Sequence, residues 1–303
     1  MDKLKLLFYT ALAAVVLTAC GGDDDKIPPA ANTGGSNGAT AGNVNANPTG
    51  EDAALGRYEC PSIKEGDNFV RLVRRTAEYG VTYIIEWDKE KRSQRWTAFQ
   101  MNNGNSVKNW ARGNWKSTSW GGDPFQPDPD LKPGERTELS QYSGSNYTRG
   151  HICASEDRVM SKEANEQTFY LSNIMPQSWS FNGSPGVWGN MENWLRTINR
   201  RDFRDALYIV KGGTIRDGQV KEVKNGLIVP QYFFMAVVKQ LGNEYKGMAF
   251  WANHDQPNVT VKSCVITIDE LEEKTGMDFF CNLPDDIENA VESKTTISDW
   301  ELN

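Results

Sequence analysis

Histidine is scarce in this chain, whose 303 residues include two histidines and five cysteines. No two cysteines have Cys-x-x-Cys spacing, which argues against a structural zinc site. Basic residues are also few, with 33 Lys and Arg against 40 Asp and Glu and a formal net charge of −7, so a generally basic surface that coats nucleic acid is not expected. Wholesale disorder is not expected either, because 38% of the residues are hydrophobic and 11% are aromatic, enough to build a core.

Residues 1–20 have the pattern of an export signal. Two lysines precede an apolar run from Leu6 to Leu17 that is too short to span a bilayer comfortably and leads into small residues. The ending Leu-Thr-Ala-Cys resembles the lipobox of bacterial lipoproteins, which implies that Cys20 is lipidated and tethers the mature chain to a membrane. We therefore expect an outer-membrane lipoprotein that faces the periplasm or the cell surface. The alternative is a short N-terminal anchor helix.

Composition divides the chain into three parts. We expect a signal peptide over residues 1–20, a flexible tether rich in acidic residues, Gly and Asn over 21–54, and one folded domain over 55–303. Residues 27–50 carry no charge and almost no large apolar side chain, so they cannot bury enough surface to offset their chain entropy.

Export would place the remaining cysteines in an oxidising compartment, where disulfides are permitted. Cys60, Cys153, Cys264 and Cys281 allow three complete pairings, and the sequence does not choose among them. We expect Cys153 to be a buried small residue at a strand end rather than a nucleophile.

The folded part is predicted to alternate strands with helices. Residues 102–145, rich in Gly, Pro, Asn and Trp, are expected to form a long irregular excursion. Apolar residues at helical spacing predict a helix over 187–203, and Asp-x-x-Glu patterns at Asp269 and Asp285 predict two more helix starts, the first closed by Gly276. The expected strands are 81–87, 96–101, 147–153, 169–174, 206–210, 232–238, 248–252 and 264–268. The predicted fold class is α+β, a central and mostly antiparallel sheet flanked by helices.

One of the two histidines, His151, lies on a predicted strand two residues after Arg149. A neighbouring arginine disfavours the imidazolium form, so the ring should be neutral and able to accept a proton at neutral pH. The alternative is an ordinary hydrogen-bonded and partly buried histidine.

The sequence downstream favours the catalytic interpretation. Residues 173–192 gather amides, a tryptophan and a carboxylate around a predicted junction between a strand and a helix. Such groups beside a neutral histidine form a candidate oxyanion and metal site.

The pattern Arg-Gly-His, then Tyr-Leu-Ser-Asn-Ile-Met-Pro-Gln, then an asparagine followed by Trp-x-x-x-Glu resembles the DNA/RNA non-specific endonuclease family. The resemblance continues through residues 229–234 and 268–285 and covers about residues 60–295. It implies a domain containing a ββα-metal (His-Me) finger. It also implies an endonuclease that hydrolyses DNA and RNA to products with 5′-phosphate ends, with Mg²⁺ as cofactor and Mn²⁺ as a substitute.

The resemblance implies roles for the reacting groups. His151 would be the general base that activates water, and Asn182 would be the protein's direct ligand to Mg²⁺. This agrees with the habit of Mg²⁺ to keep several waters and to bind through one or two protein oxygens. Glu192 would order the waters of the metal or the nearby arginine.

It also implies a supporting set. Arg149 would pair with phosphate oxygens through its planar fork, and Arg112 resembles the upstream arginine of the family. Asn173 and Gln177 match amides that support the site, although a plain structural hydrogen bond is an equal alternative for Asn173. Thr148 stands where the family usually has Asp, and two residues appear to be inserted within 183–187.

The basic and aromatic residues around this pattern suggest how nucleic acid would be held despite the negative net charge. We expect a local basic patch formed by Lys108, Arg112, Lys116, Arg149 and Arg158. Trp110, Trp115 and Trp120 would either stack on bases or anchor the long loop to the core. The second histidine, His254, is interpreted as a turn residue.

Two other functions stay open. Thr148 leaves room for a lapsed nuclease that binds nucleic acid without cutting it. Ten tryptophans and many carboxylates leave room for a glycan-active lipoprotein, in which His151 would be dispensable. The oligomeric state does not follow from the sequence.

Overall fold

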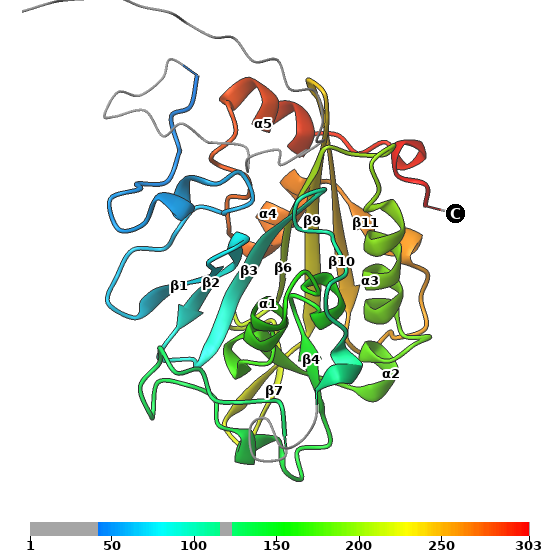
Figure 1. Cartoon of the computed structure of the whole chain (residues 1–303). Coiled ribbons are helices and arrows are strands. Elements are labelled where there is room, and N and C mark those ends of the chain that lie inside the picture. Colours follow the sequence, from blue (N-terminus) through cyan, green and yellow to red (C-terminus); the bar gives the residue numbers. More distant parts are fainter. Residues whose placement is uncertain (1–41, 116–122, 303) are drawn as a thin grey trace, which may run out of the picture.

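A seven-stranded sheet forms the centre of the molecule (Figure 1). This computed structural model describes residues 42–115 and 123–302. The strand order is β1-β2-β3-β6-β9-β10-β11, and every pairing is antiparallel. The strands are β1 (Phe69–Thr76), β2 (Gly80–Asp88), β3 (Ser93–Asn102), β6 (Ala206–Gly213), β9 (Tyr232–Leu241), β10 (Glu244–Asn253) and β11 (Val265–Ile266). The predicted α+β class with a mostly antiparallel central sheet is confirmed.

Both faces of the sheet are covered, so its central strands are apolar on both sides. Alternation along β2 sends Tyr83 and Ile85 into one core and Ile84 into the other. The first core packs against α3 (Val187–Ile198), and the second packs against α4 (Ile268–Thr275). The remaining α-helices are α1 (Lys162–Gln167), α2 (Trp179–Asn182) and α5 (Asp285–Glu292).

Two small antiparallel sheets lie beside the main one. The first pairs β4 (Thr148–His151) with β5 (Ile174–Gln177), and the second pairs β7 (Val220–Lys224) with β8 (Leu227–Pro230). The β4–β5 pair is followed along the chain by α2 and α3. Two strands followed by helix give the ββα arrangement that the resemblance implies. Seven short 3₁₀ turns complete the structure, η1 (Ala53–Gly56), η2 (Arg112–Asn114), η3 (Leu139–Tyr142), η4 (Ser155–Asp157), η5 (Leu171–Asn173), η6 (Val261–Cys264) and η7 (Ile297–Trp300).

Several predicted boundaries were wrong. The strand expected over 169–174 is a 3₁₀ turn, and the strand follows it as β5. The helix expected over 187–203 ends at Ile198. The helix α4 begins two residues earlier than its Asp-x-x-Glu pattern indicates, because Thr267, and not Asp269, is its N-cap and forms the capping box with Glu270. Gly276 closes this helix in the left-handed conformation, as predicted.

The segment N-terminal to residue 55 is partly docked, which corrects the expected tether over 21–54. The amide of Asn43 donates to the carbonyls of Cys281 and Leu283, at 3.1 and 2.6 Å. Buried Asn47 accepts from the backbone of Ile63 at 3.0 Å and donates to Pro61 at 2.9 Å. These hydrogen bonds hold the segment against the domain, although it has too few apolar side chains to be held by hydrophobic packing. The expected signal peptide, Cys20 and the first part of the tether lie outside the described residues.

The four cysteines of the described domain are buried and free. Cys153 is therefore a buried small residue, as predicted, and burial raises its pKa to about 12. Cys60 and Cys281 lie side by side, since the Cys281 thiol is 3.6 Å from the carbonyl oxygen of Cys60. Within residues 42–115 and 123–302, no helix has both the length and the apolar character needed to cross a bilayer.

Candidate active site

The histidine of the ββα unit is placed by strand pairing. In the register of β4 with β5, His151 faces Ile174 and Gly150 faces Met175. The ring of His151 lies 5.3 Å from the ring of Phe125 and 5.2 Å from that of Phe169, measured between centroids. The indole of Trp188 donates to the backbone oxygen of His151 at 3.2 Å, which ties β4 to α3. The side chain is 8% exposed, so its environment is set by the protein.

The chemistry of His151 follows from this burial and from three cations. Burial, and then the charges of Arg112, Lys211 and Arg149, lower the pKa of His151 to about 3. The ring is therefore neutral near pH 7. Its Nε2 atom is buried and has no hydrogen-bond partner among the residues that the structure describes. A neutral ring with an unused nitrogen can accept a proton from a bound molecule.

Each of the two predicted arginines lies over one of the two aromatic rings that pack against His151. The guanidinium of Arg149 lies 4.2 Å above the ring of Phe125 and pairs with Asp123. Arg112, exposed on the 3₁₀ turn η2, lies 5.6 Å from the ring of Phe169. Because the same two rings pack against His151, the guanidinium groups of Arg112 and Arg149 lie near its imidazole ring.

Asn182 ends α2 and reaches back to β4. Its amide nitrogen donates to the hydroxyl of Thr148 at 3.0 Å, and that hydroxyl donates to the backbone oxygen of Gln177 at 2.9 Å. The amide nitrogen of Asn182 is thereby engaged, so its carbonyl oxygen is the atom of the side chain that can bind a cation. Oxygen donors of this kind suit a hard cation such as Mg²⁺.

Glu192, on α3, is half-buried and pairs with Lys211 at 3.2 Å. Burial raises the pKa of Glu192, and the ammonium of Lys211 opposes that rise. The side chain of Lys211 is fully buried, and its Nζ lies 4.5 Å from the ring of Trp188. One lysine thus joins the carboxylate of Glu192 to the indole that supports the backbone of His151.

The two predicted supporting amides behave differently. Asn173 is fully buried, and its side chain hydrogen-bonds to backbone groups: it accepts from Cys153 and donates to Cys153 and Thr168, each at 2.9 Å. These bonds match the alternative of a plain structural role for Asn173, whose side chain fixes the backbone at Cys153, just after His151. Gln177 is also fully buried, but neither atom of its amide has a partner in the described part of the chain. A Cβ on Gly150 would lie 2.2 Å from the Gln177 side chain, so any larger residue would have to displace that side chain.

The expected basic patch forms only in part. Arg158 is fully buried and donates to the carbonyls of Thr82 and Asp157, at 2.8 and 2.6 Å, so it cannot contact phosphate. Lys108 is exposed, while Lys116 lies outside the described residues. The cations that do gather around His151 are Arg112, Arg149 and Lys211.

Of the loop tryptophans, Trp115 anchors the loop. Its indole donates to Asn165 at 2.7 Å, and its ring packs edge-on against Phe169 at 5.4 Å. Trp110 packs against Trp115 at 6.3 Å. Trp120 lies outside the described residues.

Two functional residues were missed by sequence reasoning. Lys211 carried a signal, since it is a lone charge within the apolar strand 206–213. His254 lies in a turn, as predicted, but it is 1% exposed and both ring nitrogens are engaged. Its Nε2 accepts from the backbone of Ser178 at 2.8 Å, and its Nδ1 donates to the carbonyl of Pro230 at 2.9 Å. It therefore fixes the start of α2, the helix that carries Asn182.

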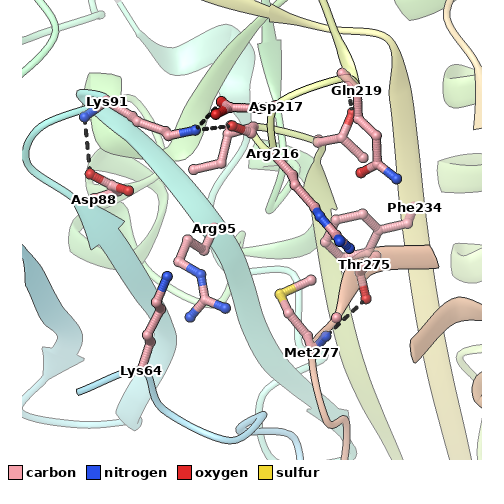
Figure 2. Close-up of a pocket in the computed structure, with 14 residues that line it drawn as sticks. Lys64, Asp88, Lys91, Arg95, Arg216, Asp217, Gln219, Phe234, Thr275 and Met277 are labelled. Atoms are coloured by element: carbon pink, nitrogen blue, oxygen red, sulfur yellow. Dashed lines mark hydrogen bonds and ion pairs between the residues drawn. The ribbon is translucent and has the colours of Figure 1, made fainter. Parts of the chain in front are cut away.

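A cavity of 530 Å³ lies elsewhere, beside Phe234 and Met277, and its lining includes none of the predicted site residues (Figure 2). Lys64, Lys91, Arg95 and Arg216 contribute positive charge to it. Lys91 pairs with Asp217 at 3.0 Å and Arg95 pairs with Glu86. Two of the four cations that line this cavity are thus neutralised by carboxylates.

Comparison with known proteins agrees with this geometry. Residues 73–286 match the DNA/RNA non-specific endonuclease family. A nuclease from Nostoc sp. is 31% identical over 223 residues, covering 70% of this chain and 76% of the relative. Mitochondrial endonuclease G of Bos taurus is 26% identical over 218 residues, covering 67% and 68%. The crystal structure of a complex of EndoG with EndoGI superposes with a TM-score of 0.58 at 20% identity, covering 72% of this chain and 89% of that one, which shows a shared fold.

The chain belongs to the DNA/RNA non-specific endonuclease family. It is an endonuclease that acts on nucleic acid, in a family that generally depends on a divalent metal.

Proposed function

We propose that this protein hydrolyses both DNA and RNA to products with 5′-phosphate ends, with His151 as the general base and Mg²⁺ as the cofactor, for which Mn²⁺ can substitute. One observation carries the proposal: a buried, neutral histidine whose unused nitrogen lies among three cations. A neutral base is needed to take a proton from water, and clustered cations are needed to hold a phosphodiester.

In this mechanism the side chains divide the work. His151 accepts the proton of the attacking water at Nε2. Arg112 and Arg149 bind phosphate oxygens, and the aromatic rings beneath them keep both guanidinium groups beside His151. Arg149 would exchange its ion pair with Asp123 for substrate, which is feasible because both side chains are about one-third exposed, at 32% and 38%.

Asn182 would be the direct protein ligand of the metal, and Glu192 would order the waters of the ion. Because Thr148 engages the amide nitrogen of Asn182, the carbonyl oxygen of that side chain can bind a cation. The half-buried carboxylate of Glu192 supplies further oxygen atoms, and oxygen ligands fit a hard cation. When bound, the ion stabilises negative charge on the phosphate and on the leaving oxygen. The hydroxyl of Thr148 accepts a hydrogen bond from the amide of Asn182 and so orients it. The family usually has Asp at this position, and threonine, like Asp, provides an oxygen that accepts this hydrogen bond.

The test uses the purified full chain with plasmid DNA and, separately, with RNA, in MgCl₂ and in EDTA. Cleavage of both polymers in MgCl₂, its loss in EDTA and its loss in His151→Ala would support the proposal. Intact plasmid together with measurable binding would show a lapsed nuclease. Cleavage of glycan, unchanged in His151→Ala, would show the other alternative.

We also propose that residues 1–20 direct export and that Cys20 is lipidated, which would make the protein an outer-membrane lipoprotein facing the periplasm or the cell surface. The lipobox-like Leu-Thr-Ala-Cys sequence supports this. In cells, Cys20→Ser should move the protein from the membrane fraction to the soluble fraction. Membrane association that persists in this variant would contradict lipidation at Cys20.

A further inference from the structure

Carboxylates gather between α4 and α5, far from the ββα unit. In Figure 1, α5 lies at the end of the sheet opposite β4. Asp269 and Glu272 extend from α4, and Glu292 is the last residue of α5. One carboxylate oxygen from each of the three lies within 4.8 Å of the others. These three residues are called the acidic cluster below.

The chemistry of the cluster suits calcium. Ca²⁺ takes about six to eight oxygen ligands, several of them carboxylates, in a flexible geometry. Mg²⁺ keeps several waters and is usually bound through only one or two carboxylates. Three carboxylate oxygens within 4.8 Å of one another therefore fit the ligand set of calcium better than that of magnesium.

Glu292 gives an independent indication of a ligand. Its side chain is 6% exposed, and its buried Oε1 has no hydrogen-bond partner among residues 42–115 and 123–302. A buried carboxylate without a partner is costly, and here it stands at the C-terminal end of a helix, where the helix dipole is also negative. A cation at this position would compensate both costs.

The surroundings of Glu292 add further negative charge. Burial and four neighbouring carboxylates, those of the acidic cluster together with Asp278 and Glu288, raise the pKa of Glu292 to about 10. Burial, with the charges of Asp278, Asp269 and Glu288, also raises the pKa of Glu272 to about 7, although the hydrogen bond from the backbone of Phe279 opposes the rise. Like charges that are gathered and buried in this way attract a divalent cation.

The cluster is also preorganised and open to water. The backbone of Phe279 donates to Glu272 at 2.7 Å, which fixes that carboxylate. Asp269 is exposed, so one side of the site admits an ion and its remaining water ligands. Beside it, the amide of Asn45 donates to Glu288 at 2.9 Å and to Asp278 at 3.2 Å, which joins the docked N-terminal segment to the same region.

We propose that the acidic cluster is a calcium site, separate from the nuclease site, that binds α4 to α5 and stabilises the C-terminal part of the domain. The inference does not depend on the proposed mechanism, because none of its ligands is near His151 in the fold.

The test measures calcium binding by the full chain at pH 7.5, by titration calorimetry and by thermal unfolding. Asn182→Ala serves as the background, because it removes the proposed metal ligand of the nuclease site. In this background one calcium ion should bind per chain. At about 100 times the Kd, CaCl₂ should raise Tm by about 5 °C. MgCl₂ at the same concentration should give a smaller shift.

Glu292→Gln should abolish both the heat of binding and the calcium-dependent shift in Tm. This variant should still fold, because glutamine has the size and shape of the protonated glutamate side chain. Glu273→Gln is the matched control: Glu273 is exposed on the same helix, and the shift should persist in that variant. No binding in the Asn182→Ala background, a shift that survives Glu292→Gln, or an equal shift with MgCl₂ would overturn the proposal. Plasmid cleavage by wild-type protein in MgCl₂ is read separately and reports on the nuclease site alone.

Discussion

The two histidines lie in two regions that use the same side chain in opposite ways. Both are buried, and burial is the largest cause of the lowered pKa of each. In the turn after β10, both ring nitrogens of His254 are engaged by backbone groups. On β4, Nε2 of His151 is left unused and positive side chains surround the ring. Burial alone thus does not separate the proposed general base from a structural histidine; what separates them is a ring nitrogen without a partner in the described part of the chain, beside positive charges.

The same substitution at both positions tests this difference most directly, and the largest effect is expected at His151. In His151→Phe the ring contacts with Phe125 and Phe169 can be kept, while the base is lost. The rate of plasmid cleavage should fall by ~10²–10⁴-fold. Stability in urea should be unchanged or slightly higher, because an unsatisfied buried nitrogen is removed.

His151→Ala should give the same loss of activity and serves as the control for any misfit of the larger ring. If either variant retained a rate within threefold of the wild type, His151 could not be the general base.

At His254 the same substitution should affect stability more than the rate of cleavage, the reverse of what is expected at His151. His254→Phe leaves the Ser178 amide and the Pro230 carbonyl without their partners, so the free energy of unfolding should fall by about 1–3 kcal/mol. Activity should fall much less than in His151→Phe, through a less well fixed α2. Urea unfolding and plasmid cleavage of the two Phe variants measure the contrast side by side. Equal stability of the wild type and His254→Phe would remove the structural role assigned to this ring.

The sequence could predict those features of the two regions that depend on residues within a single helix or strand. Periodicity identified the apolar strands and the face of α3, because both reflect side chains within one element. The strand β5 was misplaced, since Pro176 breaks a strand pattern but is tolerated in a two-stranded pair that needs few ladder donors. The N-cap of α4 was assigned to Asp269 because two capping patterns overlap, and the burial of Ile268 and Leu271 selects the one that starts at Thr267.

Within the site, the motif indicated His151 and Asn182, but their partners come from distant segments. The pairing of Lys211 with Glu192 depends on β6 lying under α3, and that of Arg149 with Asp123 depends on a loop 26 residues earlier. Such contacts are set by tertiary packing, which a single sequence does not reveal. Arg158 shows the converse, a residue near the motif that folding buries.

A smaller effect, on the magnesium requirement, is expected when the hydroxyl of Thr148 is removed but the volume of its side chain is kept. Thr148→Val keeps the volume but removes the group that orients the amide of Asn182. Loss of such an outer partner should raise the MgCl₂ concentration for half-maximal cleavage by about tenfold. Thr148→Ser restores a hydroxyl and should restore the wild-type value, and Thr148→Asp restores an acceptor. An unchanged magnesium requirement in Thr148→Val would show that Asn182 is oriented by other contacts.

The smallest effect concerns pH and again distinguishes His151 from an ordinary histidine. A base with a pKa of about 3 is almost fully neutral at both pH 5.5 and pH 7.5, so kcat/KM should change by less than about twofold between them. A base with the ordinary pKa of about 6.5 would lose activity about tenfold over the same range. Because the pKa of Glu192 is raised, Glu192→Gln is needed to assign any acid limb that is observed. A limb near pH 6.5 that persists in Glu192→Gln would contradict the low pKa of His151, because the pH dependence of kcat/KM reports the ionising groups of the free enzyme.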